Sequence, residues 1–411
     1  MKRVVIVGGG AAGFFAAIAC AQACAAAGQP AEVMVLERGN DFLAKVRLSG
    51  GGRCNVTHAC LDARALAGHY PRGGRALIGP FQRFGPADTV EWFKARGVAL
   101  KTESDGRMFP VTDCSETIVD CFLRSARAAG VILTTRCGVD SAARLPGGGF
   151  SLTLSDGRAL LCDRLLLASG GCRAGEVQTL AEALGHTLEP PVPSLFTFRV
   201  ETPWLRELSG VSVESVEVCV PGTKLRERGP VLATHWGLSG PAILRLSAWG
   251  ARSLHGLGYR FPLQINWLPQ FSQAELAAEL QARAQSQPAG FVIKTPVRPL
   301  PNRLWEQLVL AAEVAPEPRW GAFPRAALQR LLGHLTRTEF QVTGKSPHKA
   351  EFVTCGGVPL GEVDFKTMQS RIAPGLYFAG ELLNIDGLTG GFNFQAAWTT
   401  GWIAGQALAV A

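Results

Sequence analysis

Apolar residues open this 411-residue chain as a short continuous run, Val4–Val7, and a second run follows at Val33–Leu36. Between them, residues 14–27 are almost all small or apolar, which is typical of a buried helix. Short apolar runs predict strands that are covered on both faces, and a helix between two such strands predicts a parallel pair. The pattern therefore predicts a βαβ unit at the start of the chain.

Strand-like segments continue as far as the glycine pair Gly170-Gly171, after a predicted helical stretch that begins near residue 88. Turn signals such as Pro146–Gly149 and Ser155–Gly157 separate them and favour hairpins. A parallel strand, an antiparallel meander and a buried return strand together are typical of FAD-binding domains. The predicted strands cover residues 130–134, 137–145, 150–154, 159–162 and 165–168.

Proline punctuates the chain at Pro190–Pro193 and indicates the exit from this first domain. A valine-rich run at 211–220 then predicts β structure. Helices are predicted at 273–285, 302–314, 325–335 and 393–409, and a short buried strand at 375–379. We therefore predict an α/β protein with a Rossmann-type domain at 1–190 and 345–411, an inserted β domain at 191–270 and a helical part at 271–344.

A glycine motif, Gly8-Gly9-Gly10-Ala11-Ala12-Gly13, stands directly behind the first strand, and Glu37 closes the second. In a dinucleotide-binding unit the first glycine takes a tight turn, the next lets the backbone approach a pyrophosphate, and the last lets the helix lie close to the sheet. The helix N-terminus favours the anion, and a carboxylate such as that of Glu37 accepts hydrogen bonds from ribose hydroxyls. The motif predicts a bound dinucleotide.

The charge and cysteine content of the chain indicate which kinds of binding partner to expect. The net charge is +8, from 41 basic and 33 acidic residues, but no run of four basic residues occurs. We therefore expect a small-molecule substrate rather than nucleic acid. Eleven scattered cysteines without a Cys-x-x-Cys pair indicate reduced thiols and no metal site.

The N-terminus has a second interpretation, because Lys2-Arg3 precede an apolar stretch as in a signal peptide. Three consecutive glycines would interrupt the apolar helix of such a peptide, so we reject this interpretation. No segment offers the ~20 uninterrupted apolar residues that cross a bilayer. We expect a cytoplasmic protein with no membrane segment, and the sequence does not indicate an oligomeric state.

Two C-terminal motifs favour FAD over NAD alone. Gly380-Glu381 at a strand end suits the ribityl chain and the pyrophosphate, and Gly390–Asn393 opens the last helix. The N-terminus of that helix, aimed at the flavin pyrimidine edge, would stabilise negative charge on N1 and O2 of the reduced flavin. NAD would need only the first motif, so these segments predict FAD.

The segment Lys45–Thr57 resembles the signature of the HI0933-like flavoproteins, also called BaiN-type NAD(P)/FAD-dependent oxidoreductases. The resemblance continues through Gly106–Pro110, Thr234–Pro241, Gly356–Val358 and Gly380–Asn393. It implies an FAD domain made from both chain ends, an inserted β-barrel-like domain and a small helical domain. It also implies a flavin oxidoreductase, since members with assigned reactions include reducers of conjugated carbon–carbon double bonds and, in relatives, oxidases of small amines.

On this resemblance, the loop Ser49–Asn55 is expected to surround the flavin, whereas the alternative is an exposed glycine turn. Lys45 is expected to meet a phosphate or the flavin, and Cys54 is interpreted as a small packing residue. The expected cofactor-binding residues are Gly8, Gly10, Ala11, Ala12, Gly13, Glu37, Arg38, Lys45, Ser49, Gly51, Gly52, Arg53, Cys54, Asn55, Val139, Ser169, Gly170, Gly380, Glu381, Gly391, Phe392 and Asn393.

The sequence does not single out a catalytic residue, and three candidates stand side by side. Arg53 is expected to hydrogen-bond the cofactor. Arg107 can bind a carboxylate substrate as a bidentate fork or pair with a structural acid. His235 can act as a general acid or cap the turn into a helix that starts near Leu238–Pro241.

We predict an FAD-dependent oxidoreductase that transfers hydride between flavin N5 and a small organic substrate. No second GxGxxG motif exists, so NADPH or NADH would bind transiently as the donor. Three alternatives stay open: a flavin amine oxidase that uses O2, a tRNA-modifying flavoprotein, and a flavin-binding protein without turnover.

Overall fold

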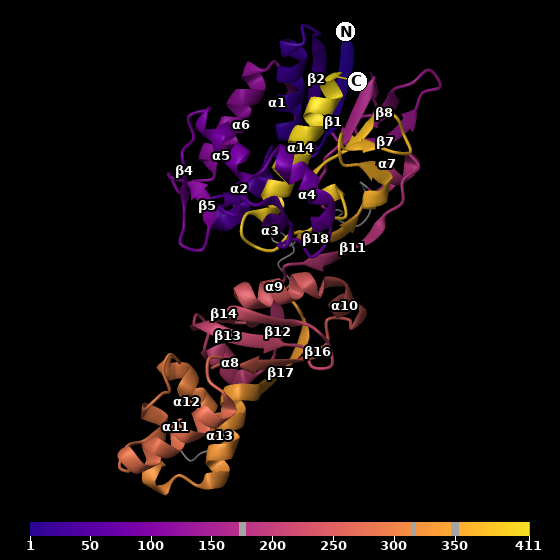
Figure 1. Cartoon of the computed structure of the whole chain (residues 1–411). Helices are drawn as coiled ribbons and strands as arrows, with labels where there is room; N and C mark the ends of the chain where they lie inside the picture. Colours follow the sequence, from indigo (N-terminus) through magenta and orange to yellow (C-terminus); the bar gives the residue numbers. More distant parts are fainter. Residues whose placement is uncertain (172–177, 314–317, 347–352, 411) are drawn as a thin grey trace. The chain divides into compact units, whose positions relative to one another are not determined.

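The computed structural model describes residues 1–171, 178–313, 318–346 and 353–410. The chain divides into two compact units, one built from residues 1–192 and 353–411 and the other from residues 193–352. Both ends of the chain therefore lie in the same unit, which we call the cofactor unit, and the second is the inserted unit (Figure 1).

The cofactor unit is organised around a seven-stranded sheet with the order β19-β20-β21-β10-β1-β2-β6. Its strands β21, β10, β1, β2 and β6 run parallel. Val4, Val5 and Ile6 of the central strand have no exposed surface, as expected for a strand covered on both faces. The bounds are β1 Lys2–Val7, β2 Ala31–Leu36, β6 Ile132–Thr134, β10 Arg164–Leu167, β19 Val363–Asp364, β20 Gln369–Ser370 and β21 Leu376–Phe378.

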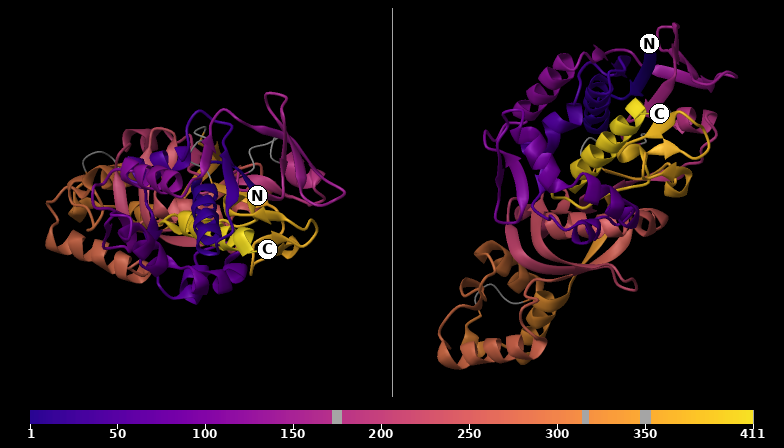
Figure 2. Two further views of the ribbon diagram at one scale, coloured as in Figure 1. Left: turned by 90° about the horizontal axis from the view of Figure 1, so that it is seen from above. Right: turned by 45° about the horizontal axis from the view of Figure 1, so that its top comes forward.

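Helices α1 (Ala11–Ala26) and α14 (Phe392–Val410) pack against each other although they come from opposite ends of the chain (Figures 1 and 2). Small residues permit this approach: a Cβ atom on Gly405 would lie 2.4 Å from the carbonyl oxygen of Ala16. Phe15 and Trp398 fill the interface with ring centroids 5.7 Å apart. The predicted Rossmann-type domain from both chain ends is confirmed.

Shorter elements complete the cofactor unit. The predicted hairpin strands form the sheet β7-β8-β9, and two more small sheets have the orders β3-β5-β4 and β11-β18. The bounds are β3 Thr57–His58, β4 Leu100–Thr102, β5 Arg107–Pro110, β7 Val139–Arg144, β8 Phe150–Leu154, β9 Ala159–Cys162, β11 Glu189–Ser194, β18 Val353–Gly357, α2 Ala44–Gly52, α3 Ala63–Ala67, α4 Gly74–Arg83, α5 Pro86–Lys94, α6 Glu116–Ala128, α7 Gln178–Ala183, η4 Leu360–Glu362 and η5 Gly380–Leu382.

The inserted unit contains a closed barrel with the strand order β12-β15-β14-β13-β16-β17. Phe198, Val216 and Leu263 are fully buried in its core. The bounds are β12 Phe198–Val200, β13 Ser212–Cys219, β14 Arg226–Thr234, β15 Gly237–Ser239, β16 Phe261–Asn266, β17 Thr338–Lys345, α8 Pro203–Glu207, α9 Pro241–Trp249 and α10 Ala251–Gly256.

A helical insertion separates the last two barrel strands. Its elements are α11 Gln273–Ser286, η1 Val292–Lys294, α12 Asn302–Ala311, η2 Trp320–Ala322 and α13 Arg325–Arg337. We expected the helical part to extend to residue 344, but residues 338–345 form β17, which pairs with β16 and β12 and closes the barrel. The difference arises because strand partners distant in sequence leave no local signal.

Candidate functional site

Three glycines in the turn between β1 and α1 have different structural roles. Gly8 has φ +113°, and a Cβ atom on Gly13 would lie only 2.0 Å from the carbonyl oxygen of Gly8. Gly10 is the N-cap residue of α1 with extended backbone angles, and a Cβ atom there would meet no atom within 4 Å. The fold itself therefore needs Gly8 and Gly13, whereas Gly10 leaves open space at the helix N-terminus, where a pyrophosphate is stabilised.

Glu37 is held beside this turn by backbone donors. Its carboxylate accepts a hydrogen bond from the N–H of Gly9 at 2.8 Å and another from the N–H of Gly39 at 2.7 Å. The neighbouring Arg38 donates to Asp140 at 2.9 Å and approaches the carbonyl of the buried Val139 at 3.4 Å. A partly exposed carboxylate in this position suits the ribose hydroxyls of a dinucleotide.

A second cluster joins four distant segments. Glu381 pairs with the Lys45 Nζ atom at 2.5 Å and accepts from the N–H of Thr354 at 2.8 Å. A Cβ atom on Gly170 would lie 4.0 Å from both side chains of the Lys45–Glu381 pair. The Ser169 hydroxyl is buried and has no hydrogen-bond partner among the described residues. Ser169 and Gly170 follow β10 and Glu381 follows β21, at the carboxyl ends of parallel strands, where ligands bind in α/β sheets.

The loop Ser49–Asn55 keeps an unusual backbone. Three consecutive glycines, Gly50 to Gly52, have φ values of +59°, +69° and +84°, so residues with a side chain would be strained there. When its amide is oriented to satisfy both of its polar atoms, Asn55 donates to the carbonyl of Thr57 at 3.1 Å and accepts from the N–H of Gly391 at 3.0 Å. This bond joins the loop to the start of α14.

Cys54 within this loop is buried, which is consistent with its interpretation as a packing residue. Its side chain is fully buried, and its N–H donates to the carbonyl of Ser49 at 3.0 Å. Burial raises the pKa of the Cys54 thiol to about 12. The thiol is therefore neutral at physiological pH and unsuited to nucleophilic or redox chemistry.

Arg53 and Arg107 are both engaged by carboxylates. Arg53 donates to Asp113 at 2.8 Å and to Glu103 at 2.5 Å, with its guanidinium 4.0 Å from the Phe109 ring centroid. Arg107 donates to Asp105 at 2.7 Å and to Glu103 at 3.2 Å. Of the two alternatives for Arg107, the structure has the pairing with acids, and Arg53 takes part in the same network. Neither arginine offers an uncommitted guanidinium to a ligand.

The charged network also lowers the pKa values of two of its carboxyl groups, those of Asp113 and Asp105. Hydrogen bonds from Lys101 and Arg53 hold the pKa of Asp113 below its ordinary value. Burial alone would raise the pKa of Asp105, but hydrogen bonds from Arg107 outweigh it and lower that pKa. Both groups therefore stay ionised at neutral pH and keep the charged network intact beside the glycine loop.

Phe392, at the start of α14, lies against two histidines that the sequence analysis missed. Phe392 stacks against His69 with ring centroids 4.2 Å apart and against His58 at 4.8 Å. The Nδ1 atom of His58 accepts from the N–H of Cys60 at 3.1 Å, so His58 carries its proton on Nε2, which lies 3.1 Å from the Asp105 carbonyl oxygen. No periodicity links residues 58, 69 and 392, so only the fold could reveal this stack.

Asn393 and Asp386 fix the loop that leads into α14. The Asn393 side chain accepts from the N–H of Gly387 at 2.8 Å and donates to its carbonyl at 2.9 Å. The Asp386 carboxylate has no exposed surface and pairs with the guanidinium of Arg72. The amide oxygen of Asn384 is buried without a partner among the described residues. Asn393 therefore acts on the loop through its side chain, and Arg72 and Asp386 are further residues that sequence reasoning missed.

His235 belongs to the inserted unit and not to the unit that holds the glycine turn. It is exposed in the turn between β14 and β15, beside Trp236 with ring centroids 6.1 Å apart. The helix expected to start near Leu238–Pro241 begins at Pro241, behind the N-cap residue Gly240, and the residues before it, Gly237–Ser239, form β15. Pairing with β12 and β14 overrides the local turn signal.

Three observations concern other kinds of site. Among residues 1–171, 178–313, 318–346 and 353–410, no group of three or more His, Cys, Asp or Glu side chains is arranged to hold a metal ion. No helix in the same ranges combines the length and the apolar character that a bilayer crossing requires. A hollow of about 470 Å³ lies in the inserted unit and contains no residue of the glycine turn or the Lys45–Glu381 cluster.

Comparison with known proteins decides between the possible families. The sequence profile of the HI0933-like protein Rossmann domain matches residues 2–407. The chain belongs to the HI0933-like family. It is therefore an enzyme of an FAD-dependent oxidoreductase family, and the resemblance stated from the sequence is confirmed.

Two curated relatives match the chain along nearly its whole length. A 3-dehydro-bile acid delta(4,6)-reductase from Clostridium scindens is 28% identical, over 100% of this chain and 99% of the relative. A ribosomal RNA dihydrouridine synthase from Escherichia coli is 30% identical, over 99% of this chain and 98% of the relative.

A solved structure shares the fold. The 3-ketosteroid-delta4-(5alpha)-dehydrogenase from Rhodococcus jostii RHA1 has a TM-score of 0.54 and 14% identity, and the match covers 100% of this chain and 97% of that one. The residues of this HI0933-like chain fit FAD, since the open face at Gly10 and the unpartnered Ser169 hydroxyl leave room and a polar partner for a dinucleotide.

Proposed function

We propose that this protein reduces a carbon–carbon double bond conjugated with a carbonyl group, with FAD as its resident cofactor and NADPH or NADH as the donor. The observation that carries the proposal is the shared chemistry of its two full-length relatives. One is named for a delta(4,6)-reduction of a 3-dehydro bile acid and the other for dihydrouridine formation in ribosomal RNA. In a 3-oxo steroid and in uracil alike, the reduced bond is conjugated with a carbonyl.

The first part of the proposed site binds the dinucleotide end of FAD. Gly10 and the N–H groups at the start of α1 would hold the pyrophosphate, because α1 has no acidic residue in its first turn to compete for the positive helix end. Glu37 would exchange one or both of its present backbone donors, Gly9 and Gly39, for ribose hydroxyls.

The second part orients the reactive end. The Lys45–Glu381 pair and the Ser169 hydroxyl would bind the middle of the cofactor. The first turn of α14 also lacks acidic residues, so its positive end would stabilise negative charge on the adjacent ring edge. When bound, FAD would supply the hydride chemistry, and the protein supplies orientation, electrostatics and exclusion of water.

The proposal is tested by product analysis. The holoprotein is incubated with NADPH or NADH and either 4-androstene-3,17-dione or a uridine-containing ribosomal RNA fragment. We expect a product that has gained two hydrogens from one of these acceptors, detected by mass spectrometry. The absence of both products, together with O2 consumption in the presence of small amines, would overturn the proposal in favour of an amine oxidase.

A further inference from the structure

Positive charge is concentrated in the inserted unit. Residues 193–352 contain 18 Lys and Arg residues but only 12 acidic residues, all of them Glu, for a net charge of +6. The rest of the chain contains 23 basic and 21 acidic residues, for a net charge of +2. The inserted unit therefore generates most of the positive potential that a polyanion would meet.

The helical insertion contains cations that no acid neutralises. Lys294, Arg298, Arg325 and Arg337 are exposed, and none has an acidic partner within the part of the chain that the structure describes. In the cofactor unit, by contrast, the arginines of the glycine-loop network are paired with carboxylates. Unpaired exposed cations repel one another at low salt, and a bound polyanion relieves that repulsion.

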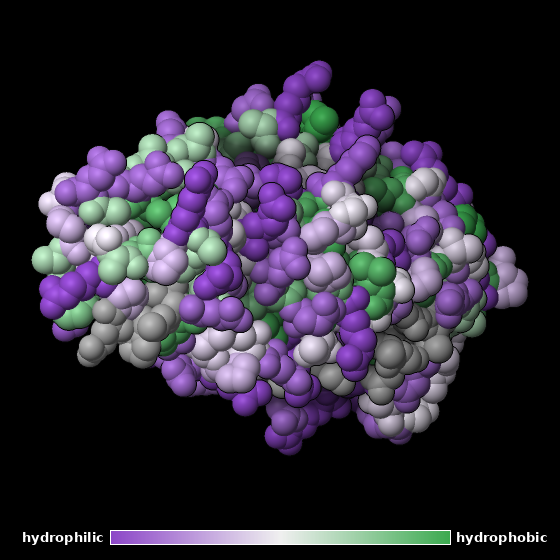
Figure 3. All heavy atoms as spheres, turned by 90° about the horizontal axis from the view of Figure 1, so that it is seen from below, coloured by the Kyte–Doolittle hydropathy of each residue, from purple (hydrophilic) through white to green (hydrophobic). Residues whose placement is uncertain are grey.

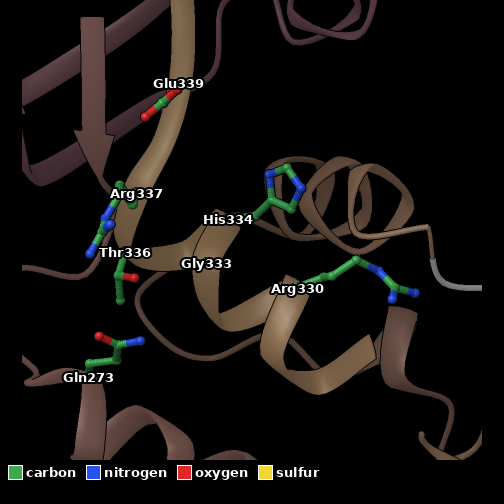
Figure 4. A pocket seen from close by; sticks show the side chains of 7 residues that line it. All are labelled: Gln273, Arg330, Gly333, His334, Thr336, Arg337 and Glu339. Atoms are coloured by element: carbon green, nitrogen blue, oxygen red, sulfur yellow. The ribbon is translucent and has the colours of Figure 1, made fainter. Parts of the chain in front are cut away.

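A hollow of about 470 Å³ opens on this helical insertion (Figure 4). Its polar lining comes from α13, the start of β17 and the start of α11, and includes Arg330, His334, Thr336, Arg337 and Gln273. Figure 4 shows Arg337, Thr336 and Gln273 along one side of the view and Arg330 on the other side. Glu339 is the one carboxylate among the lining residues, so donors predominate.

An aromatic residue lies among the cations. Phe291 is partly exposed, with the Lys294 ammonium 5.5 Å and the Arg319 guanidinium 4.8 Å from its ring centroid. Aromatic rings beside cations form stacking platforms for unpaired bases. Figure 3 shows hydrophilic residues over much of the face of the molecule that it draws, with hydrophobic residues dispersed among them.

Helix electrostatics explain only part of this pattern. His334 and Arg337 lie in the last turn of α13, where cations interact favourably with the negative helix end. Arg319 donates to the carbonyl of Ala289 at 2.7 Å and so has a structural role. Lys294 and Arg298 lie outside any such turn of an α-helix, so helix electrostatics do not account for the whole set.

We propose that the helical insertion, in its described residues 273–313 and 318–337, binds the phosphate backbone of RNA. The hollow beside Arg330 and Arg337 takes phosphate, and Phe291 stacks on an unpaired base. The inference rests on the proposed function, because it selects uracil in RNA over a small enone as the conjugated acceptor.

The test uses fluorescence anisotropy of the holoprotein with a fluorescein-labelled oligouridine of about 20 nucleotides, longer than the ~4–16 nucleotides that one binding module covers. The test variant is Arg330→Glu/Arg337→Glu. The matched control is Arg127→Glu/Arg144→Glu: Arg127 lies in the last turn of α6 as Arg337 does in α13, and Arg144 is exposed. Flavin absorbance and circular dichroism establish that each variant is folded.

We expect the test variant to lose at least about tenfold in affinity and the slope of log K against log salt to fall by about 1.4, since each lost phosphate contact on a single strand contributes about 0.7. The control should bind as the unaltered protein does. A second variant, Phe291→Ala, should weaken binding without changing the salt slope.

Equal losses in test and control variants, or no salt-dependent binding by the unaltered protein, would overturn the inference. Its failure is separable from that of the proposed function. If the protein reduces 4-androstene-3,17-dione with NADPH but does not bind RNA, the proposed reductase activity stands and the proposed RNA-binding surface is wrong. If RNA binding depends on Arg330 and Arg337 but neither acceptor is reduced, the proposed RNA-binding surface stands and the proposed reductase activity is wrong.

Discussion

At the scale of single residues, the glycine turn separates what the fold requires from what a ligand requires. Gly8 and Gly13 touch backbone so closely that a side chain at either position would disrupt the turn. Gly10 has extended angles and empty space around it, so the free protein has no steric need for glycine there. The proposed pyrophosphate site would explain its small size.

The variant Gly10→Val is therefore expected to fold normally and to lose FAD. A side chain at the helix N-terminus would occupy the space of the pyrophosphate, and we expect a loss in FAD affinity of at least about tenfold, or about 1.4 kcal/mol. Flavin content after purification and titration of the apoprotein with FAD measure it. Gly147→Val is the matched control, because Gly147 is also free of neighbouring atoms but lies in the β7–β8 turn. Full retention of FAD by Gly10→Val would contradict the assignment of the pyrophosphate site to Gly10.

Cysteine reactivity gives a second prediction at this scale. Because the Cys54 thiol is buried with its pKa raised to about 12, iodoacetamide at pH 7 should leave it unlabelled in the folded protein. Cys114 is exposed and should be alkylated. Peptide mass spectrometry before and after addition of urea distinguishes the two sites. Alkylation of Cys54 as fast as Cys114 in the folded state would contradict its interpretation as a packing residue.

At the scale of elements, buried polar contacts fix the position of α14. Gln395 has no exposed surface and its side-chain oxygen lies 2.5 Å from the Thr57 hydroxyl and 3.0 Å from the Thr89 hydroxyl. The pair of Arg72 and Asp386 holds the loop before the helix. These contacts link α14 to segments more than 300 residues away in sequence, and they set where its N-terminus points.

Removal of one partner of the buried ion pair should destabilise this region. Arg72→Met leaves the Asp386 carboxylate buried without its guanidinium, and a loss of about 3–5 kcal/mol is typical of such a change. Urea denaturation followed by flavin absorbance and circular dichroism measures it. The double variant Arg72→Met/Asp386→Leu should recover part of the loss, since no charge is then buried. A double variant less stable than the single one would show that the pair does not act as a unit.

A second polar contact joins η4 and β20 to the chain that follows α7. The buried His186 lies 2.7 Å from Glu362 through Nδ1 and 2.7 Å from the Ser370 hydroxyl through Nε2. The arrangement looks like a hydrolytic triad, but the Ser370 oxygen is buried and accepts from the N–H groups of Ile372 and Ala373. An oxygen with its lone pairs engaged in this way is not a nucleophile, so the contact is structural.

This contact predicts a pH dependence. Burial alone would raise the pKa of Glu362, but hydrogen bonds from Thr187 and His186 outweigh it and lower that pKa. The stabilisation is therefore complete above the unfolded pKa of about 4.3 and is lost as pH falls through the lower folded value. The melting temperature should fall on acidification below about pH 4.5, and less steeply for Glu362→Gln. Parallel curves for the two proteins would contradict a lowered pKa.

Elements were predictable where the signal is local. The central strand, α1 and α14 follow from apolar runs and small residues, because these patterns report burial directly. The end of the helical insertion at Arg337 and the strand β15 were not, because each depends on a distant strand partner. The pairing of Arg53 with Asp113 and Glu103 was invisible for the same reason, whereas pairing with an acid was one of the two alternatives stated for Arg107.

At the scale of the whole molecule, the distribution of charge proves more informative than its total. The net charge is +8 over 411 residues, and the absence of a run of four basic residues led us to expect a small-molecule substrate rather than nucleic acid. Division of the chain into its two units places +6 of that charge in the inserted unit, and a relative named for ribosomal RNA matches the full length. RNA therefore becomes the partner that we propose.

The measurement that tests the account most directly is an anaerobic titration of the holoprotein with NADPH and then NADH, followed by addition of a conjugated acceptor. The visible absorbance of the bound flavin should bleach at a stoichiometric dose of one nucleotide and return when 4-androstene-3,17-dione or uridine-containing RNA is added. A flavin that dithionite reduces but neither nucleotide nor acceptor changes, or a protein that takes up no FAD, would contradict the account.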